Sequence, residues 1–279
     1  MISKDSKIPM GALDLELTLP KAQEDGTVGK ALIMLDIVAA ANKPLRFNDI
    51  LAHSPFPKAT TYRFLQSMAN QGMLAYDVDT QKYSLGMRLV RLAHKAWQQA
   101  SLAPIAAPFL DQLASEIDKT IHLAQIENGQ VLFIDKRRTT ERFETLAQAG
   151  RIAPAHCTGV GKAMLAFLNS ERKGFAMQRQ NYIQFTPTTI HSVEALEQEL
   201  KVIHQDGIAY DREEHESGII SIAAPILTST QQVVGAISIA TSTSRHSIDD
   251  LQQHRQQLLT TASQIGMEAE YWQFPCSTG

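Results

Sequence analysis

The segment HCTGVGKAML, residues 156–165, places a histidine, a cysteine and a glycine-flanked lysine in one short turn before a predicted helix. Three kinds of site fit these residue types: a cysteine nucleophile, a phosphate-binding loop, and a pocket that only binds. A nucleophilic thiol needs a nearby base that a third group orients. A phosphate loop needs four residues between its first glycine and a Gly-Lys pair, then Ser or Thr.

The spacing excludes the phosphate loop. Only Val160 separates Gly159 from the pair Gly161-Lys162, and Ala163 occupies the position where a hydroxyl would hold magnesium. What remains at this turn is a glycine-rich helix start. The first backbone N–H groups of a helix have no partner inside it, so they favour a carboxylate or a polarised carbonyl oxygen. Close packing of the two glycines is the competing interpretation.

The thiol and the histidines support catalysis or metal binding less well. Cys157 has no base assigned by the sequence, because the neighbouring His156 need not point the same way. A metal held by Cys157 with His122, His156 or His215 would need a convergence that spacing alone does not show. We therefore expect no catalytic residue, no metal site and no cofactor.

Composition sets the broad class. The 279 residues are 44% hydrophobic and 20% charged, as in a globular protein of two domains. No run of about 18 apolar residues exists, and the first residues, MISKDSKIPM, do not resemble a secretion signal, so we expect a cytoplasmic protein without a membrane partner. Cys157 and Cys276 are too few for a disulfide scaffold.

Charge is distributed unevenly along the chain. Residues 27–97 carry nine basic and four acidic side chains, a net charge of +5, whereas residues 98–279 have a net charge of −6 and residues 1–26 a net charge of −2. A basic front end on an acidic body favours a polyanion as the partner of the front end.

The basic region has the pattern of a winged helix-turn-helix. After an arm of mixed composition (residues 1–26), periodic apolar residues predict a helix over 28–41. Asn48 can cap a short second helix, and a third runs from Pro57 or Lys58 to Gln71. Two short strands follow within residues 74–85, and an amphipathic helix over 87–100 is the expected linker.

The third helix offers side chains suited to DNA. Arginine matches guanine in the major groove, while lysine, threonine and tyrosine contact phosphates. A solvated face of a protein-interaction module is the competing interpretation. The residues that we expect to contact DNA, five from this helix and one from the wing, are Lys58, Thr60, Thr61, Tyr62, Arg63 and Lys82.

The remaining chain alternates between strands and helices. A hairpin over 120–137 turns at Asn128-Gly129, and a strand is expected at 144–150. A helix from Ser192 to Gly207 precedes three strands, and a final helix is predicted over 248–270. This order predicts an α+β domain built on an antiparallel sheet with a concave face.

Several ordered segments resemble the IclR family of bacterial transcription regulators. In the front end they are TVGKALIMLDIVA, PFPKATTYRFLQSMANQGML and YDVDTQKYSLG, and in the back end GRIAPAHCTGVGKAMLA and GIAYDREEHESGIISIAAP, so that the resemblance spans roughly residues 27–270. Ala59, Phe64 and Met68 depart from the family pattern, which has serine, leucine and leucine there. The resemblance implies four parts: the arm 1–26, a winged helix-turn-helix (27–86), a linker helix (87–101) and a GAF-like effector-binding domain (102–279).

The resemblance also implies a small-molecule pocket in the second domain. Its expected lining is Leu146, Gly159, Val160, Gly161, Asp211, Ser221 and Ser238. Ser221 occupies a position where the family often has cysteine, and Ala240 one where a second serine occurs, which favours a less highly charged effector. We expect Asp211 to accept from a ligand hydroxyl, and Glu213 and Glu214 to be structural.

These observations predict a transcription regulator, more specifically a repressor, rather than an enzyme. Its partners would be a double-stranded operator, a small carboxylate, lactone or aldehyde effector, and further copies of the chain in a homodimer or a dimer of dimers. The alternative is a hydrolase or redox enzyme that uses Cys157 and retains a DNA-binding domain.

Overall fold

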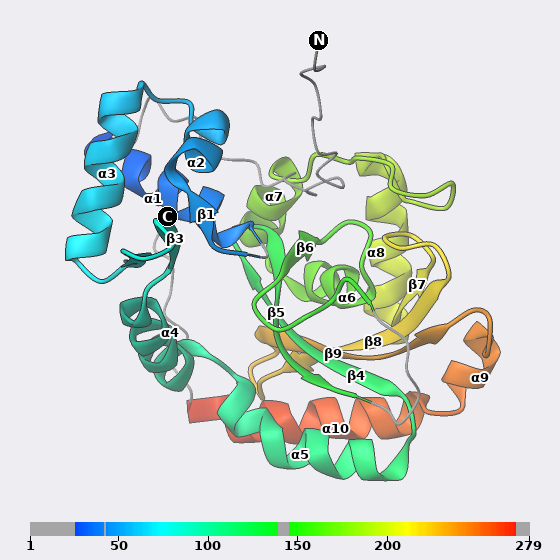
Figure 1. Cartoon of the computed structure of the whole chain (residues 1–279). Coiled ribbons are helices and arrows are strands. Elements are labelled where there is room, and N and C mark those ends of the chain that lie inside the picture. Colours follow the sequence, from blue (N-terminus) through cyan, green and yellow to red (C-terminus); the bar gives the residue numbers. More distant parts are fainter. Residues whose placement is uncertain (1–25, 42, 139–144, 272–279) are drawn as a thin grey trace. The chain divides into compact units, whose positions relative to one another are not determined.

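The computed structural model describes residues 26–41, 43–138 and 145–271, so nearly all of the predicted arm lies outside the described residues. The chain divides into two compact units, with the division between Trp97 and Gln98. Figure 1 shows the elements of both units, and each unit is described by itself.

The first unit is a winged helix-turn-helix, as predicted. Three helices pack on a small antiparallel sheet of order β1-β3-β2, around a core that includes Met34, Ile50, Leu65 and Leu74. The elements are α1 (Gly26–Ala39), β1 (Leu45–Arg46), α2 (Phe47–His53), α3 (Lys58–Asn70), β2 (Leu74–Asp77) and β3 (Lys82–Leu85).

The start of α2 differs from the prediction. Asn48 is not the N-cap, because the helix already begins at Phe47 and Arg46 occupies the capping position. Arginine carries no acceptor for the free N–H groups of the first turn. Asp49 makes the capping contact instead, and its Oδ2 accepts a hydrogen bond of 3.0 Å from the backbone N–H of Arg46.

Helix α4 (Met87–Ala100) begins and ends where the periodicity predicted the linker helix. Its exposed side chains include several large apolar ones, and α1 carries two more on its surface. They are Val28 and Leu32 on α1, and Met87, Val90, Leu92 and Trp97 on α4.

The second unit contains a six-stranded antiparallel sheet of order β6-β5-β4-β9-β8-β7. Asn128 and Gly129, both with positive φ, form the predicted two-residue turn between β4 and β5. The strands are β4 (Thr120–Glu127), β5 (Gln130–Arg137), β6 (Ile152–Pro154), β7 (Ala209–Arg212), β8 (Ile219–Leu227) and β9 (Val233–Ser242).

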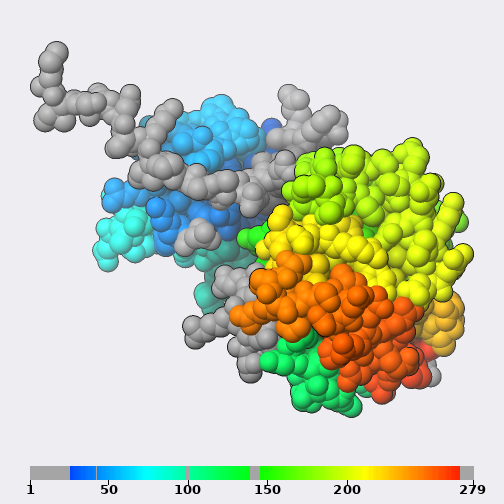
Figure 2. Space-filling view, turned by 90° about the vertical axis from the view of Figure 1, so that its right-hand side faces the viewer, coloured from blue at the N-terminus to red at the C-terminus, as the bar shows by residue number. Residues whose placement is uncertain are grey.

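Helices cover both faces of this sheet, which explains why β8 and β9 are apolar almost throughout. One face packs against α5 (Ala103–Glu116), α9 (Ile248–Gln252) and α10 (Arg255–Glu268), which continues into a short 3-10 turn (Ala269–Tyr271). The other packs against α6 (Gly159–Phe167), α7 (Ser170–Gln178) and α8 (Val193–Asp206). In Figure 2 the yellow-green α7–α8 segment and the orange-red α10 form separate bands on the surface.

Two predictions in this unit are wrong. The strand expected at 144–150 is absent from its described part, because Gly150 with φ of 85° turns the chain and the strand β6 begins only at Ile152. The expected final helix is two helices, α9 and α10, which meet at Gln253 and His254. The predicted helix from Ser192 to Gly207 is confirmed, with Ser192 as N-cap and Gly207 in the left-handed conformation.

Candidate DNA interface and ligand pocket

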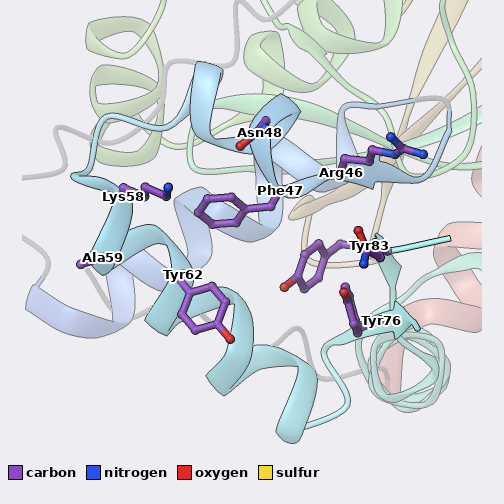
Figure 3. Close-up of a pocket in the computed structure, with 9 residues that line it drawn as sticks. Arg46, Phe47, Asn48, Lys58, Ala59, Tyr62, Tyr76 and Tyr83 are labelled. Atoms are coloured by element: carbon purple, nitrogen blue, oxygen red, sulfur yellow. The ribbon is translucent and has the colours of Figure 1, made fainter. Parts of the chain in front are cut away.

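The N-terminal turns of α3 present most of the predicted DNA contacts on the surface. Lys58, Tyr62 and Arg63 are exposed, and Thr60 is half-buried. Lys82 is half-buried at the start of β3, in the wing. Figure 3 shows Lys58 and Tyr62 on the same side of α3. These side chains supply the cations and hydroxyl groups that a DNA backbone and base edges need.

Thr61 is a correction to the predicted set. Its side chain is fully buried in the core of the first unit. Its hydroxyl lies 2.8 Å from Ser54 Oγ and donates to the carbonyl oxygen of Phe56 at 3.2 Å. Thr61 therefore fixes the turn between α2 and α3, and it is not available to DNA. Thr61 shares the inward face of α3 with Phe64, Leu65 and Met68.

In the second unit, five of the residues predicted for the pocket line one small cavity of about 40 Å³ between α6 and the sheet. They are Gly159, Val160, Asp211, Ser221 and Ser238. Sheet register explains the convergence, because Asp211 pairs with Ser221 and Ser221 with Ala240, while Ser238 pairs with His122. Directly paired residues share a face of the sheet.

Two residues predicted for the pocket do not line this cavity, namely Leu146 and Gly161, and the prediction is corrected for both. The side chain of Leu146 is 41% exposed, and only its backbone N–H takes part nearby, by donating to Glu216. A Cβ on Gly161 would lie 2.5 Å from the Cα of Ala155, so this glycine serves close packing. At Gly161 the competing interpretation of the sequence is the right one.

The cavity also contains polar side chains that the sequence did not assign to it. The ring nitrogens of His122 lie 3.5 Å from Thr145 Oγ1 and 3.4 Å from Ser238 Oγ. His215 also lines the cavity and packs edge-on against Phe185, with ring centroids 5.2 Å apart. Neither histidine carries a sequence signal for this cavity, because the pairing of β4 with β9 brings His122 to Ser238, and His215 lies in the loop between β7 and β8.

Burial makes this cavity electrostatically unusual. It raises the pKa of Asp211 to about 7, with a further contribution from the charge of Glu214. Burial also lowers the pKa of His122 to about 3, helped by Lys136, and that of His215 to about 4, helped by His156. Near neutral pH the two histidines are uncharged, and Asp211 titrates.

The start of α6 faces this cavity without a side-chain cap. Thr158, the N-cap residue, donates its hydroxyl to the carbonyl oxygen of Pro154 at 2.8 Å, and its own carbonyl accepts from the N–H of Lys162. The N–H groups of the first turn, at Gly159 and Val160, therefore remain as donors at the positive end of the helix dipole.

A buried ion pair fixes the wall that follows Asp211. Lys162 Nζ, fully buried, donates to Glu214 Oε1 at 2.6 Å and to Glu199 Oε1 at 3.3 Å. The N–H of Glu214 in turn donates to Asp211 Oδ1 at 2.8 Å. Thr189 also holds this segment, because its hydroxyl donates to the carbonyl oxygen of Glu214. The prediction that Glu214 is structural agrees with these contacts.

The environment of the Cys157 thiol disfavours the thiolate that a nucleophile needs. Cys157 is fully buried, and burial raises the pKa of its thiol further than the nearby charges of Asp211 and Glu214 do. His156 is engaged elsewhere, with its ring nitrogens 3.3 Å from Gln180 Oε1 and 3.4 Å from the Ile183 carbonyl oxygen. Among the described residues, no group of three or more His, Cys, Asp or Glu side chains could hold a metal ion.

Two family models match the chain, and together they cover most of it. The model for the IclR helix-turn-helix domain matches residues 27–78. The model for the C-terminal domain of bacterial IclR transcriptional regulators matches residues 94–267. The chain belongs to the IclR family. Members of this family are transcription regulators, so the enzyme that would use Cys157 is not supported.

Individual IclR relatives agree with this assignment. The regulator KdgR of Dickeya chrysanthemi is 31% identical over 218 residues, which are 78% of this chain and 72% of that protein. The transcriptional repressor IclR of Escherichia coli is 25% identical over 250 residues, 89% of this chain and 91% of that protein. An IclR homologue from Microbacterium hydrocarbonoxydans, solved with 4-hydroxybenzoate, shares the fold, with a TM-score of 0.73 and 22% identity over 86% of this chain and 97% of that one. Within the described part of the chain, no helix is long and apolar enough to cross a membrane.

Proposed function

We propose that the protein is a repressor whose affinity for operator DNA is controlled by a small metabolite. The first unit would read the operator through Lys58, Thr60, Tyr62, Arg63 and Lys82. We also propose that it works in the cytoplasm, where its operator is. One observation carries the proposal: a buried polar cavity, separate from the winged helix-turn-helix, lies at an uncapped helix start.

The polar groups of the cavity suit a ligand with one acidic or carbonyl oxygen and a hydroxyl. The first-turn N–H groups at Gly159 and Val160 would hold the oxygen, and Asp211 would accept from the hydroxyl. No arginine or lysine lines the cavity within the described residues. A small monocarboxylate, lactone or aldehyde therefore fits better than a multiply charged anion.

The small volume of the cavity bears on how a ligand would control DNA binding. A volume of about 40 Å³ holds little more than a water molecule, whereas metabolite pockets usually measure a few hundred Å³. Ligand entry thus requires the walls to move, and the segment at His215 and Glu216 is one of them. A ligand that binds only the expanded arrangement shifts the population toward it.

We further propose that the regulator is a dimer, or a dimer of dimers. Paired operator half-sites one helical turn apart require two DNA-binding units of related orientation. The exposed apolar side chains of α1 and α4, which include Leu32 and Val90, supply a surface of the kind that oligomers bury.

Substitution of Gly159 tests the pocket. A Cβ at this position would lie 2.8 Å from Ser221 Oγ and would fill the cavity beside the helix start. In a thermal-shift screen of small carboxylates, lactones and aldehydes, the wild type should show a raised melting temperature with its effector. Gly159→Ala should lose this increase while melting close to the wild type without ligand.

Gly174→Ala on α7 is the matched control, since a Cβ there meets nothing within 4 Å. It should keep the full ligand-induced increase. If Gly159→Ala responds to the effector as strongly as Gly174→Ala does, the ligand binds elsewhere and this pocket is wrong.

A further inference from the structure

A concave hollow of about 740 Å³ lies in the first unit, between the start of α2, the start of α3 and the wing. Four aromatic rings and two cations line it, and no carboxylate does. Figure 3 shows the four rings grouped together, with Lys58 on the left and Arg46 on the upper right. The lining residues are Arg46, Phe47, Asn48, Lys58, Ala59, Tyr62, Tyr76, Gln81 and Tyr83.

Arg46 is the residue in this hollow that the local fold does not explain. It occupies the N-cap of α2, where Ser, Thr, Asp or Asn would accept a hydrogen bond from the first turn. Among the described residues, its guanidinium has no hydrogen-bond or ion-pair partner, and Asp49 contacts only its backbone N–H. Residues that break a local rule without a structural gain are expected at functional sites.

The register of the small sheet brings a second cation next to Arg46. Arg46 pairs directly with Lys82 across β1 and β3, and Lys82 pairs with Asp77 across β3 and β2. Like charges that face each other across a sheet repel. Asp77 faces Lys82, and the Asp49 carboxylate accepts from the backbone N–H of Arg46, which leaves the Arg46 guanidinium for an external anion.

We propose that this hollow holds the sugar-phosphate backbone of the operator, with Arg46 bound to a phosphate. Lys58 would bind a second phosphate at the other end. The rings of Phe47 and Tyr62, whose centroids are 5.9 Å apart, would pack against deoxyribose. Gln66 Nε2 donates to Tyr62 Oη at 3.3 Å, which leaves the phenolic hydrogen for a phosphate oxygen. The inference rests on the proposed function and adds a backbone contact outside the recognition helix.

The test is the salt dependence of DNA binding by the full-length chain. Each phosphate contact contributes about 0.9 to the slope of log K against log salt concentration. Arg46→Ser should lower the slope by about 1, and weaken binding equally on the DNA upstream of its gene and on a random duplex, because phosphates carry no sequence information. Serine is a favoured N-cap, so Arg46→Ser should melt at or above the wild-type temperature.

Lys43→Ala is the control, since Lys43 is exposed in the same unit and lies outside the hollow. It should keep the wild-type slope, and Arg46→Lys should keep most of it. If Arg46→Ser and Lys43→Ala give the same slope and affinity while the wild type binds, the phosphate contact is wrong and the regulator is not. If the wild type binds neither duplex, the proposed function fails, and this inference fails with it.

Discussion

Asp211 links the cavity beside α6, which we propose binds the effector, to proton binding. Burial raises the pKa of its carboxyl from 3.8 to about 7. The unfolded chain therefore releases this proton more readily than the folded one, and the free energy of unfolding falls as the pH rises from about 4 to about 7. In Asp211→Asn, where the amide oxygen can still accept from the N–H of Glu214, this loss disappears.

We expect Asp211→Asn to gain stability relative to the wild type between about pH 5 and about pH 8, on the order of 2–4 kcal/mol. Melting temperatures across this range measure the difference. Glu197→Gln, which removes an exposed carboxyl from α8, should follow the wild-type profile at every pH. Parallel profiles for Asp211→Asn and the wild type would show that Asp211 is ionised in the folded protein throughout this pH range.

At the residue scale, the sequence predicted the parts of the pocket that have a local signature. Gly159 and Val160 follow from a glycine-rich helix start, and the family pattern supplied Asp211. His122 has no such signature, because only the pairing of β4 with β9 brings it to Ser238. The residue type of Thr61 made it a plausible DNA contact. Its position on the inward face of α3 buries the side chain instead.

At the scale of elements, the Lys162–Glu214 ion pair joins α6 to the segment after β7. Both side chains are buried, so Lys162→Met leaves the Glu214 carboxylate without its cation in a medium that solvates it poorly. We expect a loss of about 3–5 kcal/mol in the free energy of unfolding, measured by chemical denaturation.

The double variant Lys162→Met with Glu214→Gln provides the check on this prediction. It removes the unpaired charge and should recover part of the lost stability. A double variant that is less stable than Lys162→Met alone would show that the pair acts through packing and hydrogen bonds rather than through charge.

Elements with strong end signals were predictable, and those without them were not. Ser192 and Gly207 cap α8 as expected, and Asn128-Gly129 turns the β4–β5 hairpin. The break between α9 and α10 falls in the sequence QQHR, which contains neither glycine nor proline. Packing of α10 on the sheet and on α5 is a long-range effect that such a sequence does not encode locally.

At the scale of the whole molecule, the proposed regulation depends on two chains acting together. Val90 on α4 is 59% exposed, and a charge there would oppose burial between two copies. We expect Val90→Glu to shift the protein toward monomer in light scattering coupled to size exclusion, and to weaken operator binding. Val202→Glu on α8 is the control at the same exposure of 59%, and it should keep the wild-type mass. If Val90→Glu keeps the wild-type mass, α4 does not form the interface between the two copies.

The most direct test of the account is a DNA titration with and without the effector found by thermal shift. Fluorescence anisotropy would follow the full-length protein on the DNA upstream of its gene. The proposed regulation predicts binding that weakens steeply with salt, and an apparent Kd that rises at least severalfold with effector in the wild type but not in Gly159→Ala. Specific DNA binding that a pocket-bound effector leaves unchanged would contradict it, as would no binding at low salt.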